Sequence, residues 1–298
     1  MNKIEILKCI EDKRKLFTKI YIHKSFSSNE NSFESVSENE EESDDINIEQ
    51  IQNNHPSEFN KRDLILYPKL DKKIQKCLIK REKRTAENGS EVQYSLFLED
   101  KRKTLLLKAN YKRKNMKSSY YIVDTQDDNR ILGHIKSNSF GTEYVVYLLS
   151  DEKEDSKEEV ASIIFEANPF GIKGPRRMTI ILPTVINDKI EPIKAEKEEK
   201  NLISLWKNSA FHRIITLSNK RPIWNEETNS FALNFNGRVK IASVKNFQLV
   251  HPDDEDYVVL QFGKQTDNQF TLDYGYPMTA MQAFSIALSS FDGKLGCE

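Results

Sequence analysis

The sequence lacks the features that define several large classes of protein. It contains no run of about 20 apolar residues, the length that a membrane-spanning helix needs. Residues 1–5 lack the apolar core of a signal peptide. The three cysteines, Cys9, Cys77 and Cys297, are an odd number without paired spacing, which argues against a disulfide framework. We therefore expect a soluble cytosolic protein whose contact with any membrane is peripheral.

Signals for catalysis are also missing. The five histidines show no metal-ligand spacing. There is no Gly-x-Ser-x-Gly elbow, and no phosphate-binding loop that ends in Gly-Lys-Ser or Gly-Lys-Thr. The sequence thus predicts a binding protein and not an enzyme, with no cofactor and no metal site.

Charge is nearly balanced over the whole chain but unevenly placed along it. The net charge is −1, yet Asn29 to Gln50 contains nine acidic residues and no basic one. Such a segment cannot bury enough apolar surface to offset the entropy that ordering costs, so residues 28–57 are predicted to be disordered. The sign then reverses, because Lys101 to Lys117 contains eight basic residues and no acidic one.

Residues 1–25 carry apolar side chains close to one face of a possible short helix. The residues on that face are Leu7, Ile10, Phe17 and Tyr21. Two interpretations are open at this point. The helix packs on its own domain, or it binds a partner.

From about residue 90 the pattern becomes that of short strands, rich in β-branched and aromatic residues. The predicted strands are 120–123, 144–147, 161–165, 178–182 and 257–262, together with 231–236, where large apolar residues alternate with small or polar ones.

One segment breaks this β pattern. Residues 274–291 carry no charge, Pro277 suits the first turn of a helix, and Gly293 suits its end. A helix that is apolar almost all round must be buried. At about 15 residues it would be roughly 22 Å long, too short to span a bilayer. A buried helix after many strands predicts a barrel filled by that helix, since closure removes the sheet edges.

Two stretches resemble signatures of the tubby-like proteins. They are 235–248, with the sequence FNGRVKIASVKNFQ, and the chain end at 282–298, QAFSIALSSFDGKLGCE; shorter matches lie at 168–178, 222–225 and 273–277. The resemblance implies a mostly β fold, a closed antiparallel barrel of twelve strands around a central hydrophobic C-terminal helix. The chain then divides into an N-terminal tail at 1–60, with a possible short helix and an acidic disordered linker, and a tubby-type domain at 61–298.

The resemblance also implies a function. Relatives bind phosphatidylinositol 4,5-bisphosphate through a basic pocket on the barrel, and some carry cargo to cilia through a short N-terminal helix. We therefore expect a phosphoinositide-binding adaptor on the cytosolic face of the plasma or ciliary membrane, with residues 1–25 engaging a trafficking partner. The adaptor would link the membrane to cargo trafficking or signalling.

Two other functions are weaker predictions. One is a nuclear transcription regulator that binds nucleic acid through its basic patches, since some relatives have been linked to transcription. The near-zero net charge and the lack of a recognition-helix motif argue against it. The other is a lipid-moving protein, because scramblase-like proteins are thought to share this fold; the lack of a membrane-spanning helix argues against that function.

The candidate site follows from a matching stretch. Relatives hold the head group with basic residues in a Gly-Lys-x-Arg-Ser-Asn stretch, and residues 133–138 of this chain read GHIKSN. Lys136 keeps a positive charge but lacks the bidentate fork of arginine, and His134 is not reliably charged at pH 7. The two side chains are two residues apart, so on a strand they point to the same face.

Alignment with the family adds further positions. Lys157 matches a third basic position, and Tyr120 matches a polar position from which its hydroxyl group can donate a hydrogen bond. The run Lys112, Arg113 and Lys114 matches a basic run in relatives, and it is either a solvated hairpin or a membrane-facing patch. Arg238 and Lys245 lie in a signature, and we expect them to serve folding.

Overall fold

The computed structural model describes residues 61–68, 73–86, 89–125, 130–149, 157–166, 177–194, 201–226 and 229–292. The expected helix in 1–25 and the acidic linker in 28–57 lie outside these residues. The boundary between tail and domain stays a prediction, and the predicted helix end at Gly293 also lies outside the described chain.

Most of the described chain is strand. The strands are β1 (Gln75–Ala86), β2 (Gly89–Leu98), β3 (Leu105–Lys114), β4 (Lys117–Val123), β5 (Ile131–Ser137), β6 (Glu143–Leu149), β7 (Lys157–Phe165), β8 (Met178–Pro183), β9 (Val185–Ile186), β10 (Lys189–Ile190), β11 (Ile193–Lys194), β12 (Ile214–Asn219), β13 (Ile223–Asn225), β14 (Ser230–Ala232), β15 (Phe247–His251), β16 (Asp254–Lys264) and β17 (Gln269–Tyr274). The helices are α2 (Lys61–Leu66), α3 (Leu202–Lys207) and α4 (Ala280–Ser289).

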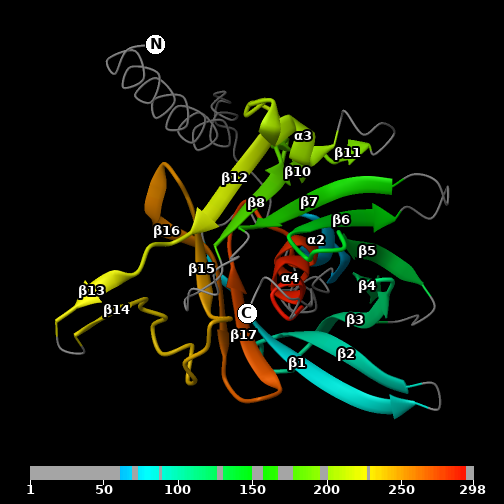
Figure 1. Ribbon diagram of the computed structural model, residues 1–298, viewed down its shortest axis with the longest axis horizontal. Helices are drawn as coiled ribbons and strands as arrows, with labels where there is room; N and C mark the ends of the chain where they lie inside the picture. The colour runs from blue at the N-terminus through cyan, green and yellow to red at the C-terminus, as the bar shows by residue number, and fades with distance from the viewer. Residues whose placement is uncertain are drawn as a thin grey trace, which may run out of the picture. The chain divides into compact units, whose positions relative to one another are not determined.

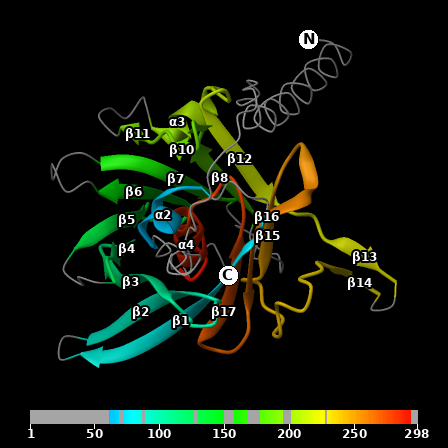
Figure 2. The ribbon, with the colours of Figure 1, turned by 180° about the vertical axis from the view of Figure 1, so that it is seen from behind.

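Twelve of these strands close into an antiparallel barrel. The order is β7-β6-β5-β4-β3-β2-β1-β17-β16-β15-β12-β8, and β8 pairs with β7 to complete the ring. Strand β11 adds to the start of β7, while β9–β10 and β13–β14 form two separate hairpins. Figures 1 and 2 show the barrel strands surrounding α4. The predicted twelve-stranded barrel is therefore confirmed.

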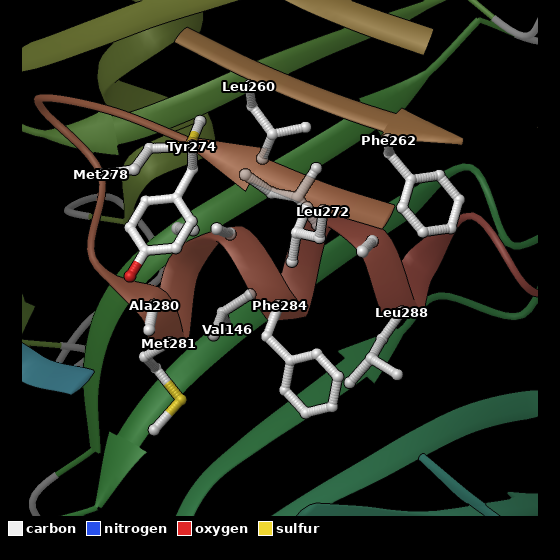
Figure 3. Packing of buried hydrophobic residues seen from close by; sticks show 14 of the residues in the cluster. Val146, Leu260, Phe262, Leu272, Tyr274, Met278, Ala280, Met281, Phe284 and Leu288 are labelled. Atoms are coloured by element: carbon white, nitrogen blue, oxygen red, sulfur yellow. The ribbon is translucent and has the colours of Figure 1, made fainter. Parts of the chain in front are cut away.

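Helix α4 fills the interior of the barrel. All ten of its residues are buried and none is charged. Figure 3 shows Met281, Phe284 and Leu288 projecting from the helix, with Leu272 of β17 and Val146 of β6 among the wall residues around it. The prediction of a buried helix inside the barrel is confirmed.

The helix begins later than the sequence predicted. Thr279 is its N-cap, and the Thr279 hydroxyl accepts a hydrogen bond from the backbone N–H of Gln282 at 3.2 Å. The Gln282 side chain accepts in return from the Thr279 N–H at 2.9 Å, which completes a capping box. Pro277 therefore precedes the helix and does not occupy its first turn. Gln282 also donates to the Val160 carbonyl of β7 at 2.8 Å, so it ties the helix to the wall.

Five of the six predicted strands are confirmed, since they lie within β4, β6, β7, β8 and β16. The sixth, 231–236, is wrong, because strand β14 ends at Ala232. Beyond it the Asn234 Oδ1 accepts from the N–H of Asn236 at 2.8 Å. Asn236 and Gly237 then take φ values of 49° and 73°. The chain turns here, as asparagine and glycine favour, so only Phe231 and Ala232 of this segment pair with another strand of the described chain, β13.

Side chains from outside α4 cover both ends of the helix. Ile65 of α2 is buried, and it lies near Met281 at the N-terminal end of α4. At the other end the Tyr144 hydroxyl donates to the buried Asp292 carboxylate at 2.6 Å, and the Phe291 ring lies 4.8 Å from that of Tyr94. Among the described residues no helix is long and apolar enough to cross a bilayer.

Truncating the core side chain of α4 tests this arrangement. Because Phe284 is fully buried, Phe284→Ala should lower the free energy of unfolding by about 3–5 kcal/mol. Urea unfolding followed by circular dichroism measures the change. Phe140→Ala is the matched control: its side chain is 74% exposed, so its effect should stay within about 0.5 kcal/mol. Equal unfolding midpoints for the two variants would contradict a packed interior.

Candidate functional site

Lys136 and His134 lie on the outward face of β5. Ile135 between them is fully buried and points into the barrel. Lys136 is exposed and His134 is half-buried. This alternation follows from the two-residue period of a strand whose other face packs on the core.

The neighbouring strands β4 and β3 extend this outward face across the sheet. Lys112 pairs with Ser119, and Ser119 pairs with Lys136, so the two lysines lie in one row across three strands. Nearer the turn of the β3–β4 hairpin, Lys114 pairs with Lys117. Both of these lysines share the face of Lys112, because each lies two residues along its strand from a member of that row. We call Lys112, Lys114, Lys117, Lys136 and Lys157, together with His134, the basic face.

The rings of two tyrosines, Tyr121 and Tyr147, pack against the side chains of the basic face. The Tyr121 ring stacks on His134, with centroids 4.4 Å apart and planes at 14°. The Lys112 Nζ lies 5.5 Å from the centroid of the Tyr121 ring, and the Lys136 Nζ lies 5.9 Å from that of Tyr147. A cation at this distance over an aromatic face is stabilised by the ring quadrupole. The ammonium groups are therefore held over neighbouring rings on the same wall.

Lys157 belongs to the same electrostatic cluster. It is the exposed first residue of β7. Partial burial lowers the pKa of His134 to about 4, and the charges of Lys136 and Lys157 contribute to this shift. Partial burial also lowers the pKa of Lys136, with contributions from Lys157 and Lys117. His134 is thus neutral at pH 7 in the free protein, whereas the sequence suggested partial charge.

The basic face is rich in cations that lack an ion-pair partner among the described residues. Among the described residues, Lys112, Lys114, Lys117, Lys136 and Lys157 form no ion pair. In the part of the chain that the structure describes, two carboxylates adjoin this wall, Glu143 at the start of β6 and the buried Glu159 opposite Tyr147 on β7, but neither forms an ion pair with these lysines. Clustered positive charge creates a local field that attracts anions. The arrangement is suited to holding phosphate groups by charge-assisted hydrogen bonds.

Tyr120 does not join the basic face. Its side chain is 1% exposed and faces the interior, with its ring 5.0 Å from that of Tyr111. Burial raises the pKa of its hydroxyl group well above the usual value. The neighbouring Tyr121 takes the outward position instead. The sequence contains one indication of this orientation: Tyr121 lies four residues after the charged Lys117, so the two side chains share one face of the strand.

The run from Lys112 to Lys114 is divided between two faces. By strand alternation, Arg113 points to the side opposite Lys112 and Lys114, although it too is exposed near the hairpin turn. Lys117 was absent from the predicted site. Its pairing with Lys114 across a two-residue turn gives it a place there.

The signature residues Arg238 and Lys245 have structural partners. The Nε and Nη2 of Arg238 donate to Asp273 at 2.7 and 2.6 Å, and Nη1 lies 2.6 Å from Glu99. Asp273 is only 2% exposed, and this bidentate partner offsets the cost of burying its carboxylate. The Lys245 Nζ donates to the Ser290 carbonyl at the C-terminal end of α4 at 3.1 Å. These contacts support the folding role expected for this signature.

A cavity of about 340 Å³ lies elsewhere, between the β13–β14 hairpin and the outer surface of β15 to β17. Its lining includes Lys220, Asp256 and Asp273, so carboxylates outnumber basic side chains. The Asp273 carboxylate is already occupied by Arg238 and by Gln261, whose amide donates at 2.7 Å. The cavity therefore does not favour an anionic ligand, and the basic face is the stronger candidate site.

Comparison with known proteins agrees with this fold. The sequence model of the Tub family matches residues 65–293. The chain is 42% identical over 242 residues to mouse Tubby-related protein 3, an alignment that covers 75% of this chain and 52% of the relative. It is 44% identical over 236 residues to Protein king tubby of Drosophila virilis, covering 76% of this chain and 52% of the relative.

A third relative is human Tubby-related protein 1, which is 40% identical over 253 residues, covering 80% of this chain and 46% of the relative. The chain thus spans about half the length of the curated relatives it matches. The match to most of the barrel shows that this chain belongs to the Tub family.

The electrostatics of the basic face can be tested by titration. In NMR spectra of the labelled protein, the His134 imidazole should titrate near pH 4, well below the usual value of about 6.5. Replacing Lys136 and Lys157 by Gln should raise the His134 pKa, because two nearby positive charges are removed. Lys101→Gln, in the turn between β2 and β3, is the control and should leave it unchanged. Titration of native His134 near pH 6.5 would contradict this packing.

Proposed function

We propose that this chain is a peripheral membrane adaptor that binds phosphoinositides, with phosphatidylinositol 4,5-bisphosphate as its ligand. The observation that carries the proposal is the gathering of Lys112, Lys136 and Lys157 around His134 on one wall, without internal ion pairs among the described residues. A bisphosphate head group presents several negative charges within the span of such a cluster. The match of residues 133–138 to the head-group stretch of tubby-like proteins supports the same assignment.

The chemistry of the site favours reversible binding. Each basic residue close to an anionic leaflet contributes about 1 kcal/mol. A hydrogen bond to a charged group adds roughly 1.5–3 kcal/mol where its geometry is good. Three or four such contacts hold a protein at a membrane and still allow release. That balance suits an adaptor that delivers cargo.

His134 makes the binding sensitive to acid. Its pKa is about 4 in the free protein, and a phosphate bound beside it would raise that pKa. Protonation is then favoured in the complex, so affinity should rise as pH falls below the pKa of the bound state. Between pH 8 and pH 7 the imidazole stays neutral in the free protein, and it offers the ligand a hydrogen bond and no charge.

The wider role of the adaptor is also part of this proposal. Residues 1–25 would engage a trafficking partner, and the barrel would hold the complex on the cytosolic face of the plasma or ciliary membrane. Both statements follow from the resemblance to tubby-like proteins. Nucleic acid is the competing ligand for a basic surface, and a binding assay separates the two.

The direct test of the site is binding to liposomes that contain the bisphosphate lipid. Lys136→Ala should weaken binding by about 1–3 kcal/mol, because a charge-assisted hydrogen bond is lost. His134→Lys should strengthen binding at pH 7, since it places a full charge where the imidazole is neutral. Lys101→Ala removes an equal charge from the turn between β2 and β3 and should have little effect. Added salt should weaken every variant by screening.

Two results would overturn the proposal. One is a Lys136→Ala/Lys157→Ala double variant that binds these liposomes as well as the native protein does. The other is tighter binding to duplex DNA than to the liposomes at the same salt concentration, which would favour the nuclear alternative.

A further inference from the structure

Two exposed apolar side chains stand at the end of the barrel that carries the basic face. Met116, in the β3–β4 turn, is 62% exposed, and Phe140, in the β5–β6 turn, is 74% exposed. Among the described residues no large apolar side chain is more exposed than Phe140. Strands β3 and β5 are both antiparallel to β4, so their following turns lie at the same end of the barrel.

The fold does not require methionine in the β3–β4 turn. Asn115 and Met116 have φ values of 48° and 62°, the left-handed conformation of a two-residue hairpin turn. Glycine is favoured at the second position of such a turn, and a side chain there is strained. Met116 therefore carries a backbone cost and an exposed apolar surface, and no packing contact in the core offsets them. Strain of this kind is concentrated at functional positions.

The β5–β6 turn is likewise held without its phenylalanine. The Asn138 Oδ1 accepts from the Thr142 N–H at 3.0 Å, and the Asn138 Nδ2 donates to the Thr142 hydroxyl at 2.8 Å. Gly141 takes a φ of 70°, and its N–H donates to the Asn138 carbonyl at 3.3 Å. These bonds fix the turn and leave Phe140 projecting from its tip.

Cations lie behind both tips, and one carboxylate joins them at the β5–β6 turn: Glu143, the first residue of β6, shares the outward face of Lys136 by strand alternation. Lys114 and Lys117 are the last pair of the β3–β4 hairpin, next to Met116. Lys136 lies four residues before Phe140, near the end of β5, and it pairs with Ser119 of β4, so the two hairpins lie side by side in the sheet. The order from the tip inward is thus apolar and then positive at the β3–β4 turn, and Lys114, Lys117 and Lys136 outnumber the one carboxylate of Glu143 across the two hairpins.

We propose that Met116 and Phe140 insert into the apolar edge of an anionic membrane while the lysines behind them contact the lipid phosphates. This inference rests on the proposed function and adds an orientation to it, with the β3–β4 and β5–β6 turns directed at the bilayer. A membrane offers an anionic layer above an apolar one, in the same order as these side chains. Nucleic acid has no comparable apolar layer beneath its phosphates, so a lipid surface is the occupant that both features fit.

The first experiment compares vesicles with the free head group. Met116→Ser/Phe140→Ser should bind vesicles containing phosphatidylinositol 4,5-bisphosphate roughly tenfold or more weakly, because the apolar area buried in the membrane is lost. It should bind soluble inositol 1,4,5-trisphosphate as the native protein does, since the lysines remain. Phe211→Ser is the matched control: Phe211 is also exposed, at 48%, and it lies between α3 and β12, so neither affinity should change.

A second measurement reports directly how deeply the side chain at position 140 enters the membrane. Phe140→Trp should show fluorescence quenching by lipids brominated on their acyl chains, whereas Phe211→Trp should gain none over the native protein. Native binding to vesicles with no loss in the double serine variant and no added quenching at position 140 would overturn insertion and leave the head-group site standing. A native protein that binds neither the vesicles nor the soluble head group would overturn both proposals.

Discussion

The structure depends on filling a closed barrel of twelve strands. Eight strands enclose an interior that side chains alone can fill, so a barrel of twelve needs a further element inside it. Helix α4 supplies that element: all ten of its residues are buried and uncharged, and Gln282 anchors it to β7. Every barrel strand must then turn one face to the helix. This packing decides which residues of each strand face inward and which face outward, and it therefore sets the composition of the outer surface.

The basic face is a consequence of this inward and outward alternation. Because the Ile135 side chain is buried in the core, His134 and Lys136 on either side of it must point outward. The registers of β3, β4 and β5 then bring Lys112 and Tyr121 beside them, although these residues are far apart in sequence. The signature around Arg238 stabilises the barrel away from the basic face. The hydrogen bonds from Arg238 to Asp273 hold a loop against the other side of the barrel. The interior stabilises the fold, while the outer wall carries charge that the fold itself does not use.

Some features of the fold and of the basic face could be predicted from the sequence, and others could not. The charge-free stretch before Phe291 was enough to predict a buried helix, but the number of strands came only from the family resemblance. The two-residue period placed His134 on one face with Lys136, yet it did not decide which of two adjacent tyrosines faces outward. The pKa of His134 depends on partial burial and on Lys157, two strands away, which no local pattern reveals. The alternation at 231–236 failed beyond Ala232, because residues 233–236 have no partner strand in the described part of the chain.

We expect the basic face to hold the inositol phosphates. The most direct measurement is the mapping of soluble inositol 1,4,5-trisphosphate onto the labelled protein by amide chemical shifts. We expect the largest changes at the amides of Lys112, Tyr121, His134 and Lys136 and at the start of β7, with the residues around Asp273 unchanged. Changes concentrated at the cavity beside β15 to β17, with none on the basic face, would contradict it.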